Sequence, residues 1–237
     1  MSKNETKSEM VREMFNDIAP TYDKLNHILS LDIDRLWRRN VVRILRRKGV
    51  KQVLDMATGT GDLAIAIARN IEGSQIFAAD FSREMLAVAH KKVEVLGLSE
   101  QISLHECDAE NISLPDDAVD VATVAFGVRN FERQQKALTE IKRTIKPGGH
   151  LVVLEFSNPK CAFVRFIYRL YSHYILPAIG KVISKHNSAY KYLPESIDQF
   201  PAPETFIEML REVGFDDIER HSQSFGIAQI YVAHKAQ

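Results

Sequence analysis

The stretch VLDMATGTGDLAIAIA, residues 53–68, decides the fold expected for this chain. It joins a short apolar run, a glycine-rich turn and a longer apolar run, which is the pattern of a buried strand that enters a helix. Gly59 and Gly61 have no Cβ, so the backbone of the turn can pass close to a ligand. In open α/β sheets, ligands bind beyond the carboxyl ends of the strands. The turn is therefore the first candidate for a binding site.

Strands and helices continue to alternate after this turn. The predicted strands are apolar and short, and they cover 51–57, 74–81, 102–109, 119–127 and 150–157. Apolar strands that alternate with helices form parallel sheets covered on both faces. The last predicted helix, 203–215, is followed by two strand-like runs, 217–225 and 228–236, with no room for a helix between them. We therefore predict an α/β, doubly wound, mostly parallel seven-stranded sheet with a C-terminal antiparallel hairpin.

The composition favours one domain without a nucleic-acid partner. The 237 residues are 45% hydrophobic and 26% charged, which is enough for a full core. Lysine plus arginine and aspartate plus glutamate both total 31, so no overall field attracts nucleic acid. Two cysteines are too few for a disulfide scaffold, and the eight histidines lack metal-ligand spacing. We expect no metal.

Two features of the chain bear on localisation. The N-terminus MSKNETKSEM lacks the apolar core of a secretion signal, and no stretch reaches the roughly 20 apolar residues of a spanning helix. We expect a cytoplasmic protein, either soluble or in contact with the inner face of the membrane. A homo-oligomer is an open alternative.

The glycine-rich turn fits a dinucleotide site when it is read alone. Gly59-x-Gly61-x-x-Ala64 matches that fingerprint, and Asp80 stands roughly 20 residues on, where a ribose-binding acid belongs. An NAD-dependent dehydrogenase is therefore one interpretation. Such an enzyme also needs a nicotinamide pocket and a hydride-transfer acid, which we do not find in the sequence.

Acidic residues at the strand ends favour a different ligand. Asp55, four residues before Gly59, is badly placed for a diphosphate but well placed for an ammonium group. Asp108, at the end of the third strand, can accept a hydrogen bond from an adenine amino group. Together with Asp80, these acids fit a ligand with a cation, a ribose and an adenine, which is S-adenosylmethionine. The alternative is that all three are ordinary turn residues.

Three longer motifs resemble those of one enzyme family. They are YDKLNHILSLDIDRLW (22–37), AFGVRNF (125–131) and RTIKPGGHLVVLEFS (143–157). Together with the acid and the glycine-rich turn, they are similar to the ubiquinone/menaquinone biosynthesis C-methyltransferase family, a class I methyltransferase family, and the resemblance runs nearly end to end. The chain departs from residues that many members carry at Asp34, Ala57, Ala125 and Tyr174.

The resemblance implies a reaction and a domain organisation. The reaction is methyl transfer from S-adenosylmethionine to a ring carbon of a polyprenylated quinol, with demethylmenaquinol to menaquinol as the first expectation. The benzoquinol precursor of ubiquinone is the alternative substrate. A dehydrogenase and a non-catalytic quinone carrier remain alternative functions. We expect an N-terminal helical cap (1–48) and a methyltransferase domain (49–237) that contains a substrate-side helical insertion (158–200).

The resemblance also implies the site residues. The predicted cofactor-binding residues lie at the ends of the first three strands and are Asp55, Gly59, Thr60, Gly61, Asp80, Phe81, Asp108 and Ala109.

A ring carbon becomes nucleophilic when a neighbouring phenol loses its proton, so the enzyme must stabilise a phenolate. Arg129 is the predicted oxyanion partner, with a structural ion pair as the alternative. Asn130 is predicted to hold the ring. Tyr22 is a candidate proton relay, although its free pKa of about 10 makes it a poor base, and packing is its alternative role.

Two segments point to a lipophilic substrate. Residues 35–47, RLWRRNVVRILRR, carry six arginines on a helical pattern, which suits anionic lipid or nucleic acid, or else a solvated face whose apolar side packs on the domain. Within 161–185, one helical face carries Phe163, Phe166, Ile167, Leu170, Tyr171 and Tyr174. This aromatic stripe predicts either a groove or lid for a prenyl tail or a part of the core.

Overall fold

The computed structural model describes residues 6–30, 32–159, 166, 170 and 187–237. In this part of the chain, seven strands form one sheet in the order β3-β2-β1-β4-β5-β7-β6. The strands are β1 (Gln52–Met56), β2 (Gln75–Asp80), β3 (Ile102–Glu106), β4 (Val119–Ala125), β5 (Ile145–Phe156), β6 (Asp216–Gln223) and β7 (Ala228–His234). Strands β1 to β5 are parallel, while β7 runs antiparallel to both β5 and β6. The predicted fold is confirmed.

The order of the strands fixes where a ligand can bind. β1 pairs with β2 on one side and with β4 on the other, so the chain changes direction across the sheet beside β1. Loops leave the carboxyl ends of these strands in opposite directions, and a crevice opens between them. The glycine-rich turn that follows β1 borders this crevice.

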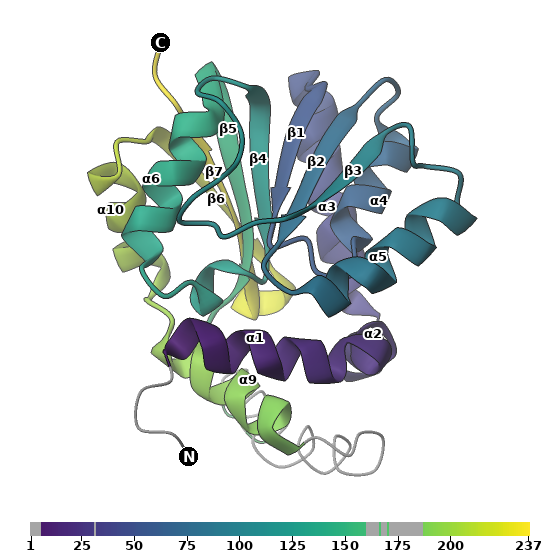
Figure 1. Ribbon diagram of the computed structural model, residues 1–237. Coiled ribbons are helices and arrows are strands. Elements are labelled where there is room, and N and C mark those ends of the chain that lie inside the picture. The colour runs from purple at the N-terminus through teal and green to yellow at the C-terminus, as the bar shows by residue number, and fades with distance from the viewer. Residues whose placement is uncertain (1–5, 31, 160–165, 167–169, 171–186) are drawn as a thin grey trace.

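Helices cover both faces of the sheet (Figure 1). One face carries α3 (Ile33–Lys48), α4 (Asp62–Asn70) and α5 (Arg83–Val95), and the other carries α6 (Gln134–Thr144) and α10 (Pro203–Glu212). Each face buries its own apolar cluster, one with Trp37 and Leu45 of α3 and one with Phe206 of α10. The segment 33–48, which the sequence places in the cap, thus packs on the sheet.

The remaining helices lie across the carboxyl edge of the sheet (Figure 1). These are α1 (Lys7–Ile18), α2 (Tyr22–Leu29) and α9 (Asn187–Gln199), and a short 3-10 turn, η1 (Ala19–Thr21), joins the first two. A capping box at Thr6 and Glu9 begins α1. Lys7 Nζ donates to the carbonyl oxygens of Arg129 (3.1 Å) and Phe131 (3.2 Å), and this ties the cap to the loop after β4.

β5 begins five residues earlier than predicted. The strand runs from Ile145 through Lys-Pro-Gly-Gly (146–149) to Phe156, and its pairing with β4 shifts register between Val119 and Val121. Gly149 permits this, because a Cβ there would lie 2.7 Å from the carbonyl oxygen of Asp120. Among the described residues, no helix is both long enough and apolar enough to cross a membrane.

Candidate active site

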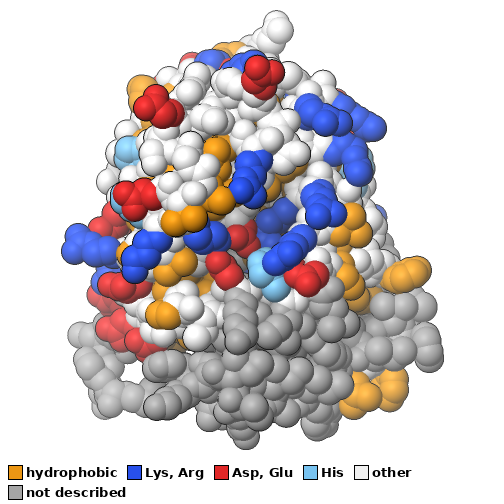
Figure 2. Space-filling view, turned by 90° about the vertical axis from the view of Figure 1, so that its right-hand side faces the viewer, with side chains coloured by type: hydrophobic (Ala, Val, Ile, Leu, Met, Phe, Trp, Pro, Cys, Tyr) orange, Lys and Arg blue, Asp and Glu red, His pale blue; other side chains and the backbone are white. Residues whose placement is uncertain are grey.

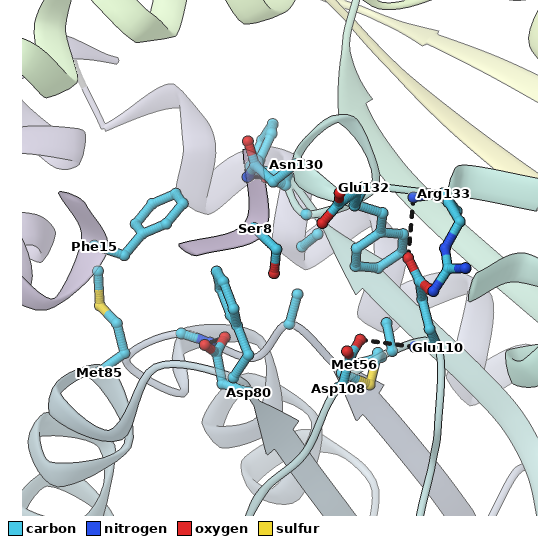
Figure 3. A pocket seen from close by; sticks show the side chains of 18 of the residues that line it. Ser8, Phe15, Met56, Asp80, Met85, Asp108, Glu110, Asn130, Glu132 and Arg133 are labelled. Atoms are coloured by element: carbon cyan, nitrogen blue, oxygen red, sulfur yellow. Dashed lines mark hydrogen bonds and ion pairs between the residues drawn. The ribbon is translucent and has the colours of Figure 1, made fainter. Parts of the chain in front are cut away.

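A cavity opens between the carboxyl ends of β1 to β4 and the helices α1 and α2 (Figure 3). The strand ends and the turn after β1 contribute Met56, Gly59, Asp80 and Asp108. The loop after β4 contributes Phe126, Gly127 and Asn130. The cap contributes Ser8, Phe15 and Tyr22. Of the predicted cofactor-binding residues, those that line the cavity are Gly59, Asp80, Phe81, Asp108 and Ala109. Asp55, Thr60 and Gly61 are not among the described lining residues.

The turn after β1 depends on left-handed backbone geometry. Gly59 and Gly61 have φ values of +58° and +81°, which side chains other than glycine adopt at a cost. A Cβ on Gly61 would also lie 3.3 Å from the Cβ of Ala89 on α5. Ala57 takes a φ of +55° despite its side chain, so the backbone of the turn is strained at this position too.

Asp80 is oriented by the backbone of the turn. Its carboxylate accepts hydrogen bonds from the N–H groups of Gly59 (2.8 Å) and Ser82 (2.9 Å), and it is almost fully buried. Burial raises the pKa of Asp80 to about 6, and the nearby charge of Asp55 also raises it, while the two N–H donors act in the opposite direction. Asp80 is thus a preorganised acceptor at the cavity wall.

Asp55 lies one layer deeper, at the end of β1. Its two oxygens accept hydrogen bonds from Thr58 (2.6 Å) and Thr123 (2.6 Å). Burial raises the pKa of Asp55 to about 6, and both hydroxyl donors oppose this shift. The residue therefore supplies negative charge from beneath the cavity.

The third acid, Asp108, stands on the exposed rim. It accepts a hydrogen bond from the N–H of Glu110 (2.9 Å), and Glu110 in turn forms an ion pair with Arg133 (2.5 Å), as Figure 3 shows. Carboxylates at the ends of β1, β2 and β3 thus follow one edge of the sheet, as the sequence predicts.

A network behind the turn holds the cap in place. Thr60 donates its hydroxyl hydrogen to Asp23 of α2, and Lys92 of α5 bridges Asp23 (2.7 Å) and Asp62 (2.6 Å). Thr60, predicted as a cofactor ligand, therefore contacts the cap. We call Asp23, Thr60, Asp62 and Lys92 the cap latch.

Arg129 lies in a buried ion pair rather than on the cavity wall. Its guanidinium donates to Glu155 of β5 (2.7 Å), to the carbonyl oxygen of Phe126 (2.6 Å) and to Ser196 of α9 (3.3 Å). Arg129 is not among the described residues that line the cavity. It therefore joins three elements around the loop after β4, which is the structural alternative that the sequence left open.

Asn130 and Tyr22 both face the cavity. Asn130 accepts a hydrogen bond from the Tyr192 hydroxyl of α9 (3.0 Å). Tyr22 meets Phe15 edge to face, with ring centroids 6.0 Å apart. Burial raises the pKa of Tyr22, and the positive charges of Arg129 and Arg38 act against that rise. Its phenol is therefore a neutral hydrogen-bonding group at pH 7.

One cluster near α2 was not predicted from the sequence. His27, Asp34 and Asp62 have ligand atoms within 4.8 Å of one another, which is close enough for a metal ion. The guanidinium of Arg38 already contacts the Asp34 carboxylate, and its Nη2 atom lies 3.7 Å from Oδ2 of Asp62. Arg38 thus pairs with both carboxylates, Lys92 supplies a second positive charge to Asp62 (2.6 Å), and Asp34 also accepts a hydrogen bond from Ser30 (2.6 Å). The cluster anchors α2 to α3 and α4.

Comparisons with known proteins agree with this geometry. A demethylmenaquinone methyltransferase of Bacteroides fragilis is 43% identical over 234 residues, which is 99% of this chain and 96% of the relative. A ubiquinone/menaquinone biosynthesis C-methyltransferase of Geobacter sulfurreducens is 44% identical over 97% of this chain and 90% of its own length. The fold is shared with a SAM-dependent methyltransferase of Thermotoga maritima at 17% identity, with a TM-score of 0.64 over 94% of this chain and 99% of that one. The profile of the ubiE/COQ5 methyltransferase family matches residues 2–235, and the chain belongs to that family.

Proposed function

We propose that this protein transfers a methyl group from S-adenosylmethionine to a ring carbon of a polyprenylated quinol, with demethylmenaquinol as the substrate, and that the reaction releases S-adenosylhomocysteine and the proton that the ring carbon carried. The observation that carries the proposal is Asp80, a buried carboxylate that two backbone N–H groups orient at the cavity wall. The names of the relatives supply the substrate class.

The residues of the cavity fit the proposed cofactor. Asp80 would accept hydrogen bonds from ribose hydroxyls, as carboxylates at the end of a second strand do in related folds. Asp108 on the rim would accept from the adenine amino group, and the ring would lie against Phe81 and Ala109. Asp55 would attract the ammonium group from below. When bound, the sulfonium supplies an electrophilic methyl group.

The chain's own groups would then hold and orient the quinol ring. Asn130 and Tyr22 present neutral hydrogen-bonding groups to the cavity, next to the apolar ring of Phe126. Neutral donors of this kind stabilise a developing phenolate when they are fixed in place. Asn130 is fixed by Tyr192, and its loop is fixed by Arg129. We assign Arg129 the role of a positioning residue.

An NAD-dependent dehydrogenase is less consistent with the charge of the site. Asp80 suits the ribose of either cofactor, but Asp108, Glu110 and Glu132 also line the cavity, and carboxylates repel a diphosphate. Calorimetry with S-adenosylhomocysteine and with NAD⁺ separates the two functions. We expect binding of the first ligand only, and tight binding of NAD⁺ alone would overturn the proposal.

The identity of the ring can be tested in cells. The names of the relatives include both menaquinone and ubiquinone synthesis. In a strain that lacks this protein, mass spectrometry of extracted quinones should show an accumulating demethyl precursor. We expect demethylmenaquinone, and a demethylated benzoquinone would assign the alternative substrate.

Loosening the cap latch should speed cofactor exchange. Lys92→Met removes the bridge between Asp23 and Asp62, so α2 should open more often over the cavity. We expect S-adenosylhomocysteine to dissociate roughly two- to fivefold faster, because partly exposed ion pairs contribute up to about 1 kcal/mol. Displacement followed by stopped flow measures this rate. Arg83 lies on the same helix as Lys92, and Arg83→Met, which breaks an exposed ion pair with Glu106 of β3, is the control. An unchanged rate in Lys92→Met would contradict a latch.

We also propose that part of the insertion contacts the prenyl tail, and that the protein works at the cytoplasmic face of the membrane. Phe163, Ile167, Tyr171 and Tyr174 of the predicted stripe lie outside the described residues. Phe166 and Leu170 are 68% and 49% exposed, so neither is a core residue. Their surfaces are free to meet a tail or lipid.

Phe166→Asp tests this contact. We expect a higher KM for a prenylated quinol and little change for a tail-less analogue, because tail burial contributes about 25 cal/mol per Å². Steady-state kinetics with the two substrates gives the comparison. Val95→Asp, which alters an exposed apolar residue at the end of α5, controls for the added charge. Equal effects of Phe166→Asp on both substrates would show that this residue does not contact the tail.

A further inference from the structure

The turn between β6 and β7 holds a phenylalanine in an unusual position. In η4 (Ser224–Gly226), Phe225 has a left-handed backbone (φ +58°, ψ +24°), although such positions favour glycine or asparagine. Its side chain is 85% exposed, so packing within the described residues does not compensate for this strain. Strained residues that persist without a packing role point to a function.

Hydrogen bonds fasten this turn to α3. Trp37 donates its indole N–H to the Ser224 hydroxyl (2.9 Å), and Asn40 donates to the side-chain oxygen of Gln223 (2.8 Å). Trp37 itself packs edge to face on Phe156. Phe225 therefore stands on a rigid base beside the first turns of α3.

The same part of α3 exposes further apolar side chains and then arginines. Ile33 and Leu36 are both exposed, and Leu36 begins a row at spacings of three and four with Arg39, Arg43 and Arg47, which places these residues on one side of the helix. Within the described residues, no ion pair involves these three arginines, and Arg43 contacts only the neutral Asn40. Figure 2, which views the molecule from the right-hand side of Figure 1, shows a group of lysine and arginine side chains at its upper right and exposed hydrophobic side chains lower on the same side.

We propose that this surface, made of Ile33, Leu36, Phe225, Arg39, Arg43 and Arg47, docks on an anionic membrane, and we call it the docking face. An anionic bilayer binds such a surface in two ways. The exposed apolar side chains insert below the headgroups, and the arginines are attracted to the negatively charged lipids. The face begins at the carboxyl edge of the sheet, where η4 and the start of α3 lie near the cap (Figure 1). It would thus bring the cavity to the lipid in which a polyprenylated quinol dissolves. In this respect the inference rests on the proposed function.

Vesicle co-sedimentation tests the docking face. Wild-type protein should bind phosphatidylcholine vesicles that contain phosphatidylglycerol and should not bind phosphatidylcholine alone. Asparagine tolerates a left-handed backbone, so Phe225→Asn keeps the turn while it removes the ring. We expect Phe225→Asn combined with Leu36→Ser, or Arg39→Gln combined with Arg43→Gln, to lower binding by about tenfold or more.

Matched controls lie on α4 and α5, outside the docking face. Val95→Ser removes an equally exposed apolar side chain at the end of α5, and Arg69→Gln removes an exposed charge at the end of α4. Both should bind vesicles like the wild type. Wild-type protein that ignores anionic vesicles, or docking-face variants that bind as well as the wild type, would overturn the proposal. A homodimer that Phe225→Asn dissociates, measured by light scattering, would overturn it in favour of a second copy of the chain.

Failure of docking is distinguishable from failure of the proposed function. Methyl transfer to a short-tailed quinol in detergent needs no membrane, so Phe225→Asn should retain it fully. Loss of this activity in the variant would contradict a role limited to docking. Vesicle binding by wild-type protein without methyl transfer would refute the proposed chemistry and leave the docking face standing.

Discussion

Replacing Arg129 with leucine should lower the free energy of unfolding by about 3–5 kcal/mol, the range for breaking a buried ion pair. The Glu155 carboxylate is completely buried, and the guanidinium of Arg129 is its charged partner among the described residues. Removing that partner leaves an uncompensated charge inside the protein. Urea unfolding followed by circular dichroism measures the loss.

The double variant Arg129→Leu, Glu155→Leu is the control. Replacing a buried ion pair with apolar residues is often nearly neutral, so the double variant should recover most of the lost stability. If Arg129→Leu alone were as stable as the wild type, the ion pair would not be formed as the structure has it.

The same pair separates positioning from direct oxyanion stabilisation. If Arg129 acts through the loop that carries Asn130, Glu155→Gln should lower kcat in parallel with Arg129→Leu, by about 10² at temperatures where both variants are folded. KM for S-adenosylmethionine should change little. If only the arginine variant lost activity, and Arg129→Lys restored it, Arg129 would act directly on the substrate.

Asp80→Ala should weaken the binding of S-adenosylhomocysteine by about 1.5–3 kcal/mol, the range for hydrogen bonds to a charged group. The carboxylate is already oriented by Gly59 and Ser82, so little of its interaction energy is spent on ordering it. Isothermal calorimetry gives the affinity directly.

A matched acid at the opposite edge of the sheet provides the control. Asp120 also accepts two backbone hydrogen bonds, from Lys51 and Gln52 (2.8 Å each). Asp120→Ala should therefore affect stability without changing affinity. Equal affinities of wild type and Asp80→Ala would remove Asp80 from the cofactor site.

Cofactor affinity should fall as the pH drops below about 6. Burial raises the pKa values of both Asp55 and Asp80 to about 6, from 3.8. The ligand needs both carboxylates ionised, so protonation below that pH competes with binding by up to about tenfold per pH unit for each group. The same raised pKa values affect stability in the opposite sense. As the pH rises from about 4 to 6, the two carboxyl groups ionise in the unfolded chain but stay protonated in the folded protein, so the free energy of unfolding decreases. Calorimetry from pH 5 to 7.5 checks the first effect, and an affinity independent of pH would contradict it.

The sequence predicts the sheet and the acidic edge well because both depend on local patterns. Each strand is an apolar run, and the carboxyl ends of parallel strands meet at one edge, so Asp55, Asp80 and Asp108 had to lie along it. Gly59 and Gly61 signal the tight turn by themselves. The family motifs in 22–37 and 143–157 add the reaction class.

Contacts between distant segments could not be predicted in this way. Glu155 interrupts an apolar strand, which marks it as unusual, but nothing in the sequence pairs it with Arg129, 26 residues earlier. Thr60 stands in the turn like a ligand-binding residue, yet its hydroxyl contacts Asp23. Ser8 and Phe15 lie on an ordinary amphipathic helix, and only the packing of α1 across the sheet edge brings them to the cavity. In each case tertiary packing selects the partner.

The most direct test of the proposed reaction is methyl transfer by the purified protein. Incubated with S-adenosylmethionine that carries an isotopically labelled methyl group and with reduced demethylmenaquinone, the protein should place the label on the quinol ring. One S-adenosylhomocysteine should form per methylated product, as mass spectrometry can measure, and Asp80→Ala should be strongly impaired at low cofactor concentration. Unlabelled quinol under conditions in which the cofactor binds would contradict the account.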